Sequence, residues 1–179
     1  MFTFVSGNLA LDFAGTVNAR TTEYLDRLTT PADLARWLRE AGVLDAAPDC
    51  DETALRRAVE VREAGYRSAL AAMHGEPPAP ADRTVLNEAA RADTPVVTLR
   101  ADGSIHRTGT VPAALAAVAR SAIELLGGPD RERIRQCGRD TCTRLYVDTS
   151  RGGTRRWCDM ARCGNRAKSA AFRARHGGV

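Results

Sequence analysis

The sequence predicts a mainly α-helical N-terminal domain with one small β-hairpin, followed by a compact C-terminal module in which a β-hairpin and a helix surround four cysteines. Three observations lead to this fold class. Apolar residues recur at helical spacing through the first 130 residues, two cysteine pairs lie near the C-terminus, and the two parts of the chain differ in charge. Residues 1–130 have 13 arginines and 18 acidic residues, a net charge of −5, whereas residues 131–179 have 13 basic and 4 acidic residues, a net charge of +9. We therefore expect two domains, 1–130 and 131–179, with different partners.

The composition is that of a globular protein, because 44% of the 179 residues are hydrophobic and 27% are charged. No apolar run approaches the roughly 20 residues of a membrane span. The N-terminal segment has no basic residue and carries Asp12 within its apolar stretch, which argues against a signal peptide. We therefore expect a cytoplasmic protein without a membrane partner. Thiols stay reduced in that compartment, so cysteine pairs there indicate metal binding rather than disulfides.

Helices are expected to form most of the N-terminal domain. Thr30 is a capping residue and Pro31 suits the first helical position, so together they start a helix that Gly42 ends. Asp82 is expected to cap a short helix after a proline-rich link. The helices, in order, are predicted at residues 8–19, 30–41, 51–74, 82–89 and 110–126.

The one hairpin of this domain is predicted between the last two helices. Val96–Leu99 and residues 105–107 are β-prone, and they flank Asp102-Gly103, which is a strong turn signal. The helix that follows ends at residues 127–129 (GGP), where we expect the domain boundary.

Four of the five cysteines form the pattern C-x4-C-x15-C-x4-C within an arginine-rich stretch. A structural Zn²⁺ takes four ligands in a tetrahedron, and two cysteine pairs on separate turns supply them. Four thiolates close the coordination sphere, so this pattern disfavours a catalytic zinc. Free or redox-active thiols and an iron–sulfur cluster are the alternatives. Cys50 has no matching partner and is expected to be an ordinary thiol. The predicted zinc ligands are Cys137, Cys142, Cys158 and Cys163.

Around these cysteines we expect a treble-clef-like zinc finger. Residues 138–141 form a knuckle turn, residues 145–147 form a strand, and residues 150–153 reverse the chain into a second strand at 155–158. Asp159 then starts a helix that carries the fourth cysteine in its first turn. The few apolar residues cannot offset the entropy of ordering about fifty residues, so metal binding is expected to supply the folding free energy.

Several of these segments resemble a known family. Residues 137–142 (CGRDTC), 145–150 (LYVDTS), 155–158 (RRWC) and 163–166 (CGNR) resemble the CGNR zinc finger. Residues 7–13 (GNLALDF) resemble the opening of the ABATE domain, which accompanies that finger in bacterial stress-responsive transcription regulators; Gly15-Thr16 stands where the family pattern has Asn-Thr. The two resemblances cover nearly the whole chain. They imply zinc, DNA binding and a mostly helical N-terminal domain.

The basic residues favour nucleic acid as the partner of the finger, because a net charge of +9 on 49 residues exceeds what solubility requires. Arg162, Arg166 and Arg173 recur on one side of the last predicted helix, where they can straddle phosphates or contact guanine. Asn165 and Arg166 can instead hydrogen-bond to the knuckle or its thiolates. Aromatic residues are only 5% of the chain, which favours duplex DNA over single strands. The predicted DNA-contacting residues are Arg155, Arg156, Arg162, Arg166, Lys168, Arg173 and Arg175.

The N-terminal domain contains no recognisable catalytic set. His74 and His106 are isolated, and there is neither a phosphate-binding glycine loop nor a G-x-S-x-G motif, so we do not expect an enzyme. Asp12 is the one charged residue in an apolar stretch, and with Asn8 and Arg20 it is a candidate for binding a small molecule; the alternative is a helix cap or a solvent-facing residue. We expect the domain to sense an effector or to mediate homodimerisation.

The sequence therefore predicts a zinc-containing, DNA-binding transcription regulator. Two alternatives remain at this point. The finger is a structural zinc module whose arginines bind an acidic protein, or it is a thiol switch in which oxidation ejects the zinc.

Overall fold

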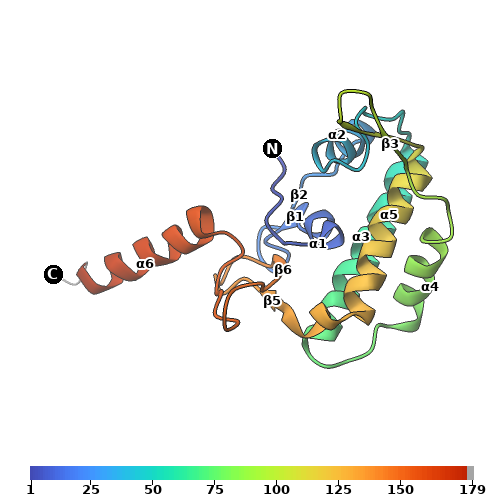
Figure 1. The fold of residues 1–179 in the computed structure, drawn as a ribbon. Helices are drawn as coiled ribbons and strands as arrows, with labels where there is room; N and C mark the ends of the chain where they lie inside the picture. Colours follow the sequence, from blue (N-terminus) through green and yellow to red (C-terminus); the bar gives the residue numbers. More distant parts are fainter. Residues whose placement is uncertain (177–179) are drawn as a thin grey trace.

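Three helices form the framework of the N-terminal domain. In the computed structural model, which describes residues 1–176, α3 (Glu52–Met73), α4 (Pro80–Ala89) and α5 (Val111–Gly127) pack side by side (Figure 1). α1 (Leu9–Ala14) packs on α3 and α5, and α2 (Pro31–Glu40) packs on α3. The predicted mainly helical domain is confirmed.

The main hydrophobic core lies between these helices. Phe13 of α1 and Trp37 of α2 are fully buried, and their ring centroids lie 4.4 Å apart. Ala58 on α3 and Ala114 and Ala119 on α5 are fully buried in the same cluster. These small side chains let α3 and α5 approach each other closely.

Side-chain caps satisfy the first free N–H groups of α1, α2, α3 and α5, whereas α4 has no such cap. Thr30 and Asp33 form a reciprocal capping box at the start of α2, as the Thr30-Pro31 signal indicates. The prediction that Asp82 caps α4 is wrong, because α4 begins at Pro80. Asp82 lies within the first turn, where its buried carboxylate accepts hydrogen bonds from the guanidinium of Arg67.

The first helix is shorter than predicted. α1 ends at Ala14, and the chain continues into a short hairpin of β1 (Val17–Asn18) and β2 (Leu25–Asp26). The physical reason is the buried Arg62 of α3, which donates to Thr16 at 3.2 Å and to both carboxylate oxygens of Asp26 at 2.8 and 2.7 Å. These bonds hold both sides of the hairpin against α3.

The second hairpin is confirmed. β3 (Val96–Leu99) and β4 (Ile105–Thr108) pair antiparallel, with Val96 opposite Thr108 and Leu99 opposite Ile105. The turn is closed by the side chain of Asp102, which accepts from the N–H of Ser104 at 2.9 Å.

The finger contains a hairpin and a helix, but its strand pairing differs from the prediction. β6 (Leu145–Val147) pairs with β5 (Ile134–Gln136), which precedes the knuckle, and not with residues 155–158. Residues 155–158 form no strand because side chains and turns already use their backbone groups. Asp148 and Ser150 accept from the N–H of Arg155, and the carbonyl of Arg156 accepts from Gly138 at 2.8 Å.

The finger hairpin and the helical domain share a second hydrophobic cluster. Ile134, Leu145 and Val147 of the hairpin pack with Leu11 of α1 and with buried residues of α3 and α5, among them Ala69. A short 3₁₀ helix, η1 (Pro129–Arg133), connects α5 to this hairpin. The hairpin is therefore fixed on the helical framework.

The last helix leaves the body of the protein. A π-helical turn, η2 (Met160–Gly164), leads directly into α6 (Asn165–His176), which extends away from the rest of the chain (Figure 1). As predicted, the side chain of Asp159 caps this segment, accepting from the N–H of Ala161 at 2.9 Å.

None of the helices within residues 1–176 combines the length and the apolar character that crossing a membrane requires.

Candidate metal centre and basic surface

The four cysteines of the repeated pattern meet at one point. Their sulfur atoms all lie within 4.8 Å of one another. The Sγ of Cys158 lies 3.9 Å from that of Cys142 and 3.6 Å from that of Cys163. A tetrahedral zinc with bonds of about 2.3 Å requires sulfur–sulfur edges of about 3.8 Å, so the four side chains fit this ion.

Two short turns bring the cysteines together. In the first turn, the N–H of Cys142 donates to the carbonyl of Arg139 at 2.8 Å, which closes the knuckle. Gly138 lies within this turn, where an added Cβ would approach the carbonyl oxygen of Arg156 to 3.0 Å. In the second turn, the N–H of Cys163 donates to Asp159 at 3.0 Å. Each cysteine pair is thus held by local backbone bonds.

Cys137, Cys142 and Cys158 lie close enough together to shift one another's pKa. Hydrogen bonds from Cys142 and then Cys158 lower the pKa of Cys137 to about 2, and the same bond to Cys137 raises the pKa of Cys142 to about 11. The pKa of Cys158 is raised as well, first by its hydrogen bond to Cys137. Without a metal, one thiolate in this cluster therefore suppresses ionisation of its neighbours. A divalent ion that accepts four thiolates removes this conflict, and the all-sulfur donor set suits zinc.

Two aromatic residues form the small core around the cysteines. Tyr146 is 1% exposed, and the half-buried Trp157 packs against the same cluster.

Arg144 joins the cysteine module to the helical domain. It is buried and lies two residues after the ligand Cys142. Its guanidinium donates to the carbonyl of Thr3 at 3.1 Å and to the carbonyl of Gly15 at 2.9 Å, and it lies 4.0 Å from Asp12. Its own carbonyl accepts from the N–H of Cys137 at 3.0 Å. One residue therefore contacts both the metal-binding turn and the N-terminal domain.

Residues 3–6 run along the cysteine module and make further contacts with it. The N–H of Val147 donates to the carbonyl of Ser6 at 2.8 Å. The guanidinium of Arg162 donates to the hydroxyl of Thr3 at 2.8 Å. These bonds extend the junction from the knuckle to the start of η2.

The structure separates the predicted DNA-contacting residues into two groups. Arg155 is half-buried: its guanidinium donates to the carbonyls of Trp157 and Val5 and lies 4.3 Å from the centre of the Tyr146 ring. Arg162 is exposed but contacts Thr3. The side chain of Arg175 is outside the described residues. The exposed basic residues on α6 and beside it are Arg156, Arg166, Lys168 and Arg173.

The three candidate ligand residues of the N-terminal domain each make hydrogen bonds within the protein. Asn8 caps α1 by accepting from Ala10 and Leu11, and Arg20 pairs with Glu63 through two hydrogen bonds.

Asp12 accepts the N–H groups of Val5 and Ser6 at 3.0 and 2.9 Å, which orders residues 3–6. Burial raises the pKa of the Asp12 carboxyl, and the hydrogen bonds from Ser6 oppose that shift.

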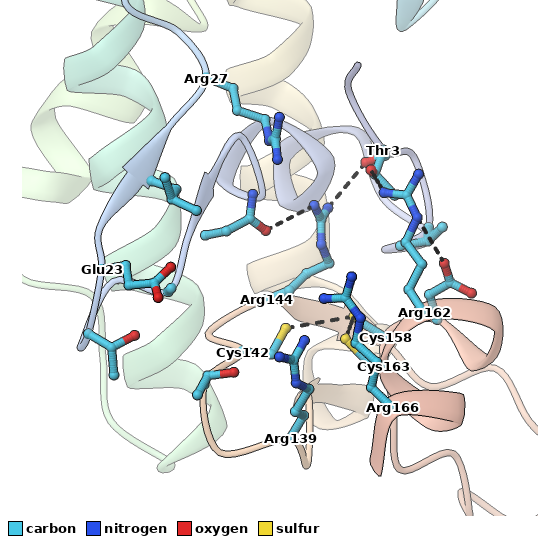
Figure 2. Close-up of a pocket in the computed structure, with 17 residues that line it drawn as sticks. Thr3, Glu23, Arg27, Arg139, Cys142, Arg144, Cys158, Arg162, Cys163 and Arg166 are labelled. Atoms are coloured by element: carbon cyan, nitrogen blue, oxygen red, sulfur yellow. Dashed lines mark hydrogen bonds and ion pairs between the residues drawn. The ribbon is translucent and has the colours of Figure 1, made fainter. Parts of the chain in front are cut away.

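Sequence reasoning missed a cleft that lies beside the cysteines (Figure 2). It has a volume of about 460 Å³ and lies between the module and the β1–β2 hairpin. Arg27, Arg139 and Arg144 line it together with Arg162 and Arg166. Arg27 comes from a segment more than 100 positions before Arg139 and Arg144, so their meeting depends on the tertiary fold.

Two family models match the chain in this order. One, described as "ABATE: Putative stress-induced transcription regulator", matches residues 7–129, and the other, described as a CGNR zinc finger, matches residues 133–176. The curated proteins compared with the chain include no match.

Proposed function

Because this chain belongs to the ABATE family and carries a CGNR zinc finger, we propose that it is a zinc-dependent transcription regulator that binds duplex DNA through its C-terminal finger. It acts by binding rather than by catalysis. The observation that supports the proposal best is α6, a basic helix that extends from the zinc-binding module into solvent (Figure 1).

The shape of α6 suits the major groove of DNA. Its 12 residues give a helix about 18 Å long, and the groove of B-DNA, about 12 Å wide, admits an α-helix. A helix of this length is marginal in water without packing partners. Contacts with DNA would add to its stability.

The exposed basic side chains determine the kind of contact. Arg166, Lys168 and Arg173 project from α6, and Arg156 lies just before the second cysteine pair. Such residues neutralise phosphates, and arginine also donates to guanine in the groove. Arg155 has a different role, because its contacts with backbone carbonyls and Tyr146 hold the finger together.

Binding to DNA should depend strongly on salt. If about six phosphates are neutralised, the logarithm of the affinity falls with the logarithm of salt concentration at a slope near −5. Replacing Arg166, Lys168 and Arg173 by glutamine should reduce the magnitude of that slope by roughly 3. Fluorescence anisotropy with a short duplex across a salt series measures both values.

The matched control replaces three exposed arginines of the N-terminal domain, Arg39, Arg83 and Arg91, by glutamine. This variant has the same change in net charge, and its slope should equal that of the unmodified protein. Equal losses in the two triple variants, or binding that does not depend on salt, would reject the proposed interface. No duplex binding by the zinc-loaded protein would favour an acidic protein as the partner of the finger.

A further inference from the structure

The cleft beside the cysteines is built from both parts of the chain. Its lining includes Asn18, Ala19 and Glu23 from the β1–β2 hairpin, and Arg139 and Cys142 from the knuckle. Small-molecule sites have volumes of about 300 to 1,000 Å³, and this cleft has about 460 Å³. A bound molecule of modest size would contact the helical domain and the finger at once.

The charge of the cleft is positive. Five arginines line it, against the two carboxylates of Glu23 and Asp159. Asp159 already lies 4.0 Å from Arg162. A four-thiolate zinc centre has a formal charge of −2, and the arginines still exceed all these negative charges.

Three of the arginines are available to a ligand. Within residues 1–176, the side chains of Arg27, Arg139 and Arg166 make no hydrogen bond or ion pair with the protein. Figure 2 shows Arg27 reaching toward the opening from one side and Arg139 and Arg166 from the other. Arg144, at the back of the same space, is held in place by carbonyl groups.

The hairpin that forms one wall has an unusual backbone. Ala19, which lines the cleft, has φ of 51°, and Tyr24 at the end of the same loop has φ of 44°. Residues other than glycine rarely adopt this left-handed conformation, because it costs about 1 kcal/mol or more of conformational free energy. Residues with such a strained backbone are common at ligand-binding sites. The carbonyl of Ala19 accepts from the N–H groups of Thr22 and Tyr24 at 3.0 and 2.8 Å, which holds the loop in this shape.

We propose that this cleft binds the phosphate group of a ligand through Arg27, Arg139 and Arg166. A phosphate presents several oxygens in different directions, and guanidinium groups arriving from three separate segments can each donate to a different one. This site is separate from the DNA-contacting helix, except for Arg166 at the start of α6. The inference does not require DNA binding, because the phosphate is tested without DNA.

Binding there would couple the two parts of the chain. Arg27 belongs to the segment held by Arg62 of α3, whereas Arg139 and Arg166 belong to the metal-binding turn and to α6. A phosphate that bridges them would fix the start of α6 relative to the helical domain. The presence of the ligand would thereby change how firmly α6 is held.

The test titrates the zinc-loaded full-length protein with inorganic phosphate by isothermal calorimetry, at constant ionic strength maintained with sodium chloride. We expect saturable binding of one phosphate per chain. Arg27→Gln should weaken it roughly ten-fold or more, because a hydrogen bond between charged groups is lost. Arg83→Gln is the matched control, an exposed arginine on α4, and should bind as the unmodified protein does.

A second arm identifies the source of the phosphate. Arg27→Gln is compared with Arg83→Gln for duplex binding across the salt series. A salt slope reduced by roughly 1 in Arg27→Gln alone assigns the site to a phosphate of the DNA backbone. Equal slopes assign it to a small phosphorylated molecule, which leaves the DNA interface as a separate site.

The inference is overturned if phosphate produces no saturable heat beyond that of chloride, or if Arg27→Gln binds phosphate as tightly as Arg83→Gln does. Metal content measured on each variant, at one zinc per chain, ensures that a loss of binding does not come from loss of the finger. Arg139→Gln, subject to the same metal measurement, provides an independent second variant. Failure of phosphate binding in the calorimetric test would leave the proposed DNA binding by the finger unaffected.

Discussion

Removal of zinc is expected to unfold residues 131–176 and to destabilise the helical domain with them. The four sulfurs gather within 4.8 Å around a core of few side chains, mainly Tyr146 and Trp157. Zinc binding supplies on the order of 10 kcal/mol in such modules. Leu145 and Val147 also complete the cluster around Leu11, so their release exposes apolar surface on α1, α3 and α5. Circular dichroism and thermal melting with and without a chelator measure this loss.

A pair of cysteine variants provides the control. Cys158→Ser removes a ligand and should leave the protein with less than one zinc per chain and a much lower melting temperature. Cys50→Ser removes the one cysteine outside the cluster, a half-buried residue beside the main core, and should retain full metal content. A Cys158→Ser protein that kept its zinc and its melting temperature would contradict the four-thiolate centre.

Truncation of Arg144 is expected to be the most damaging single change away from the cysteines. Arg144→Ala leaves the carbonyls of Thr3 and Gly15 without their donor and removes the cation that lies 4.0 Å from the half-buried Asp12. We expect the free energy of unfolding to fall by about 3 kcal/mol. Urea denaturation measures the change. Arg151→Ala, at an exposed loop position of the same module, should change stability little, and a similar loss there would argue against this account.

A substitution at Gly15 tests the contact between Arg144 and the N-terminal domain independently. A Cβ at this position would lie 2.2 Å from a guanidinium nitrogen of Arg144, which is buried and cannot easily move. The backbone of Gly15 has φ of −72°, which alanine adopts without strain. Gly15→Ala should therefore destabilise the unmodified protein but be neutral or slightly stabilising in the Arg144→Ala background. Additive losses in the double variant would show that the clash is absent.

Local signals predicted much of this structure. Thr30-Pro31 and Asp102-Gly103 act through hydrogen bonds between near neighbours in sequence, and both produce the elements expected from them. The two cysteine pairs are also determined locally, because backbone hydrogen bonds within its own turn hold each pair. In the folded chain the sulfurs of the two pairs lie within 4.8 Å of one another. This is why the cysteine cluster could be predicted without knowledge of the fold.

The remaining features depend on residues that are distant in sequence. β5 pairs with β6 because residues 134–136 lie against α3, whereas the N–H of Arg155 is already bound by Asp148 and Ser150. Arg144 and Arg155 carry the same charge as the arginines on α6, yet they bind backbone carbonyls of residues 3–15. Composition cannot distinguish an arginine that joins two domains from one that contacts a partner.

The bond between Ser6 and Val147 has a consequence for synthesis of the chain. These residues are separated by 141 positions, and Val147 is the donor for the carbonyl of Ser6. At about 5 to 20 residues per second, a ribosome needs on the order of ten seconds to make the intervening polypeptide. Residues 3–6 therefore leave the exit tunnel long before their binding partner exists. Completion of the native state is a late event that awaits translation of the cysteine-rich region.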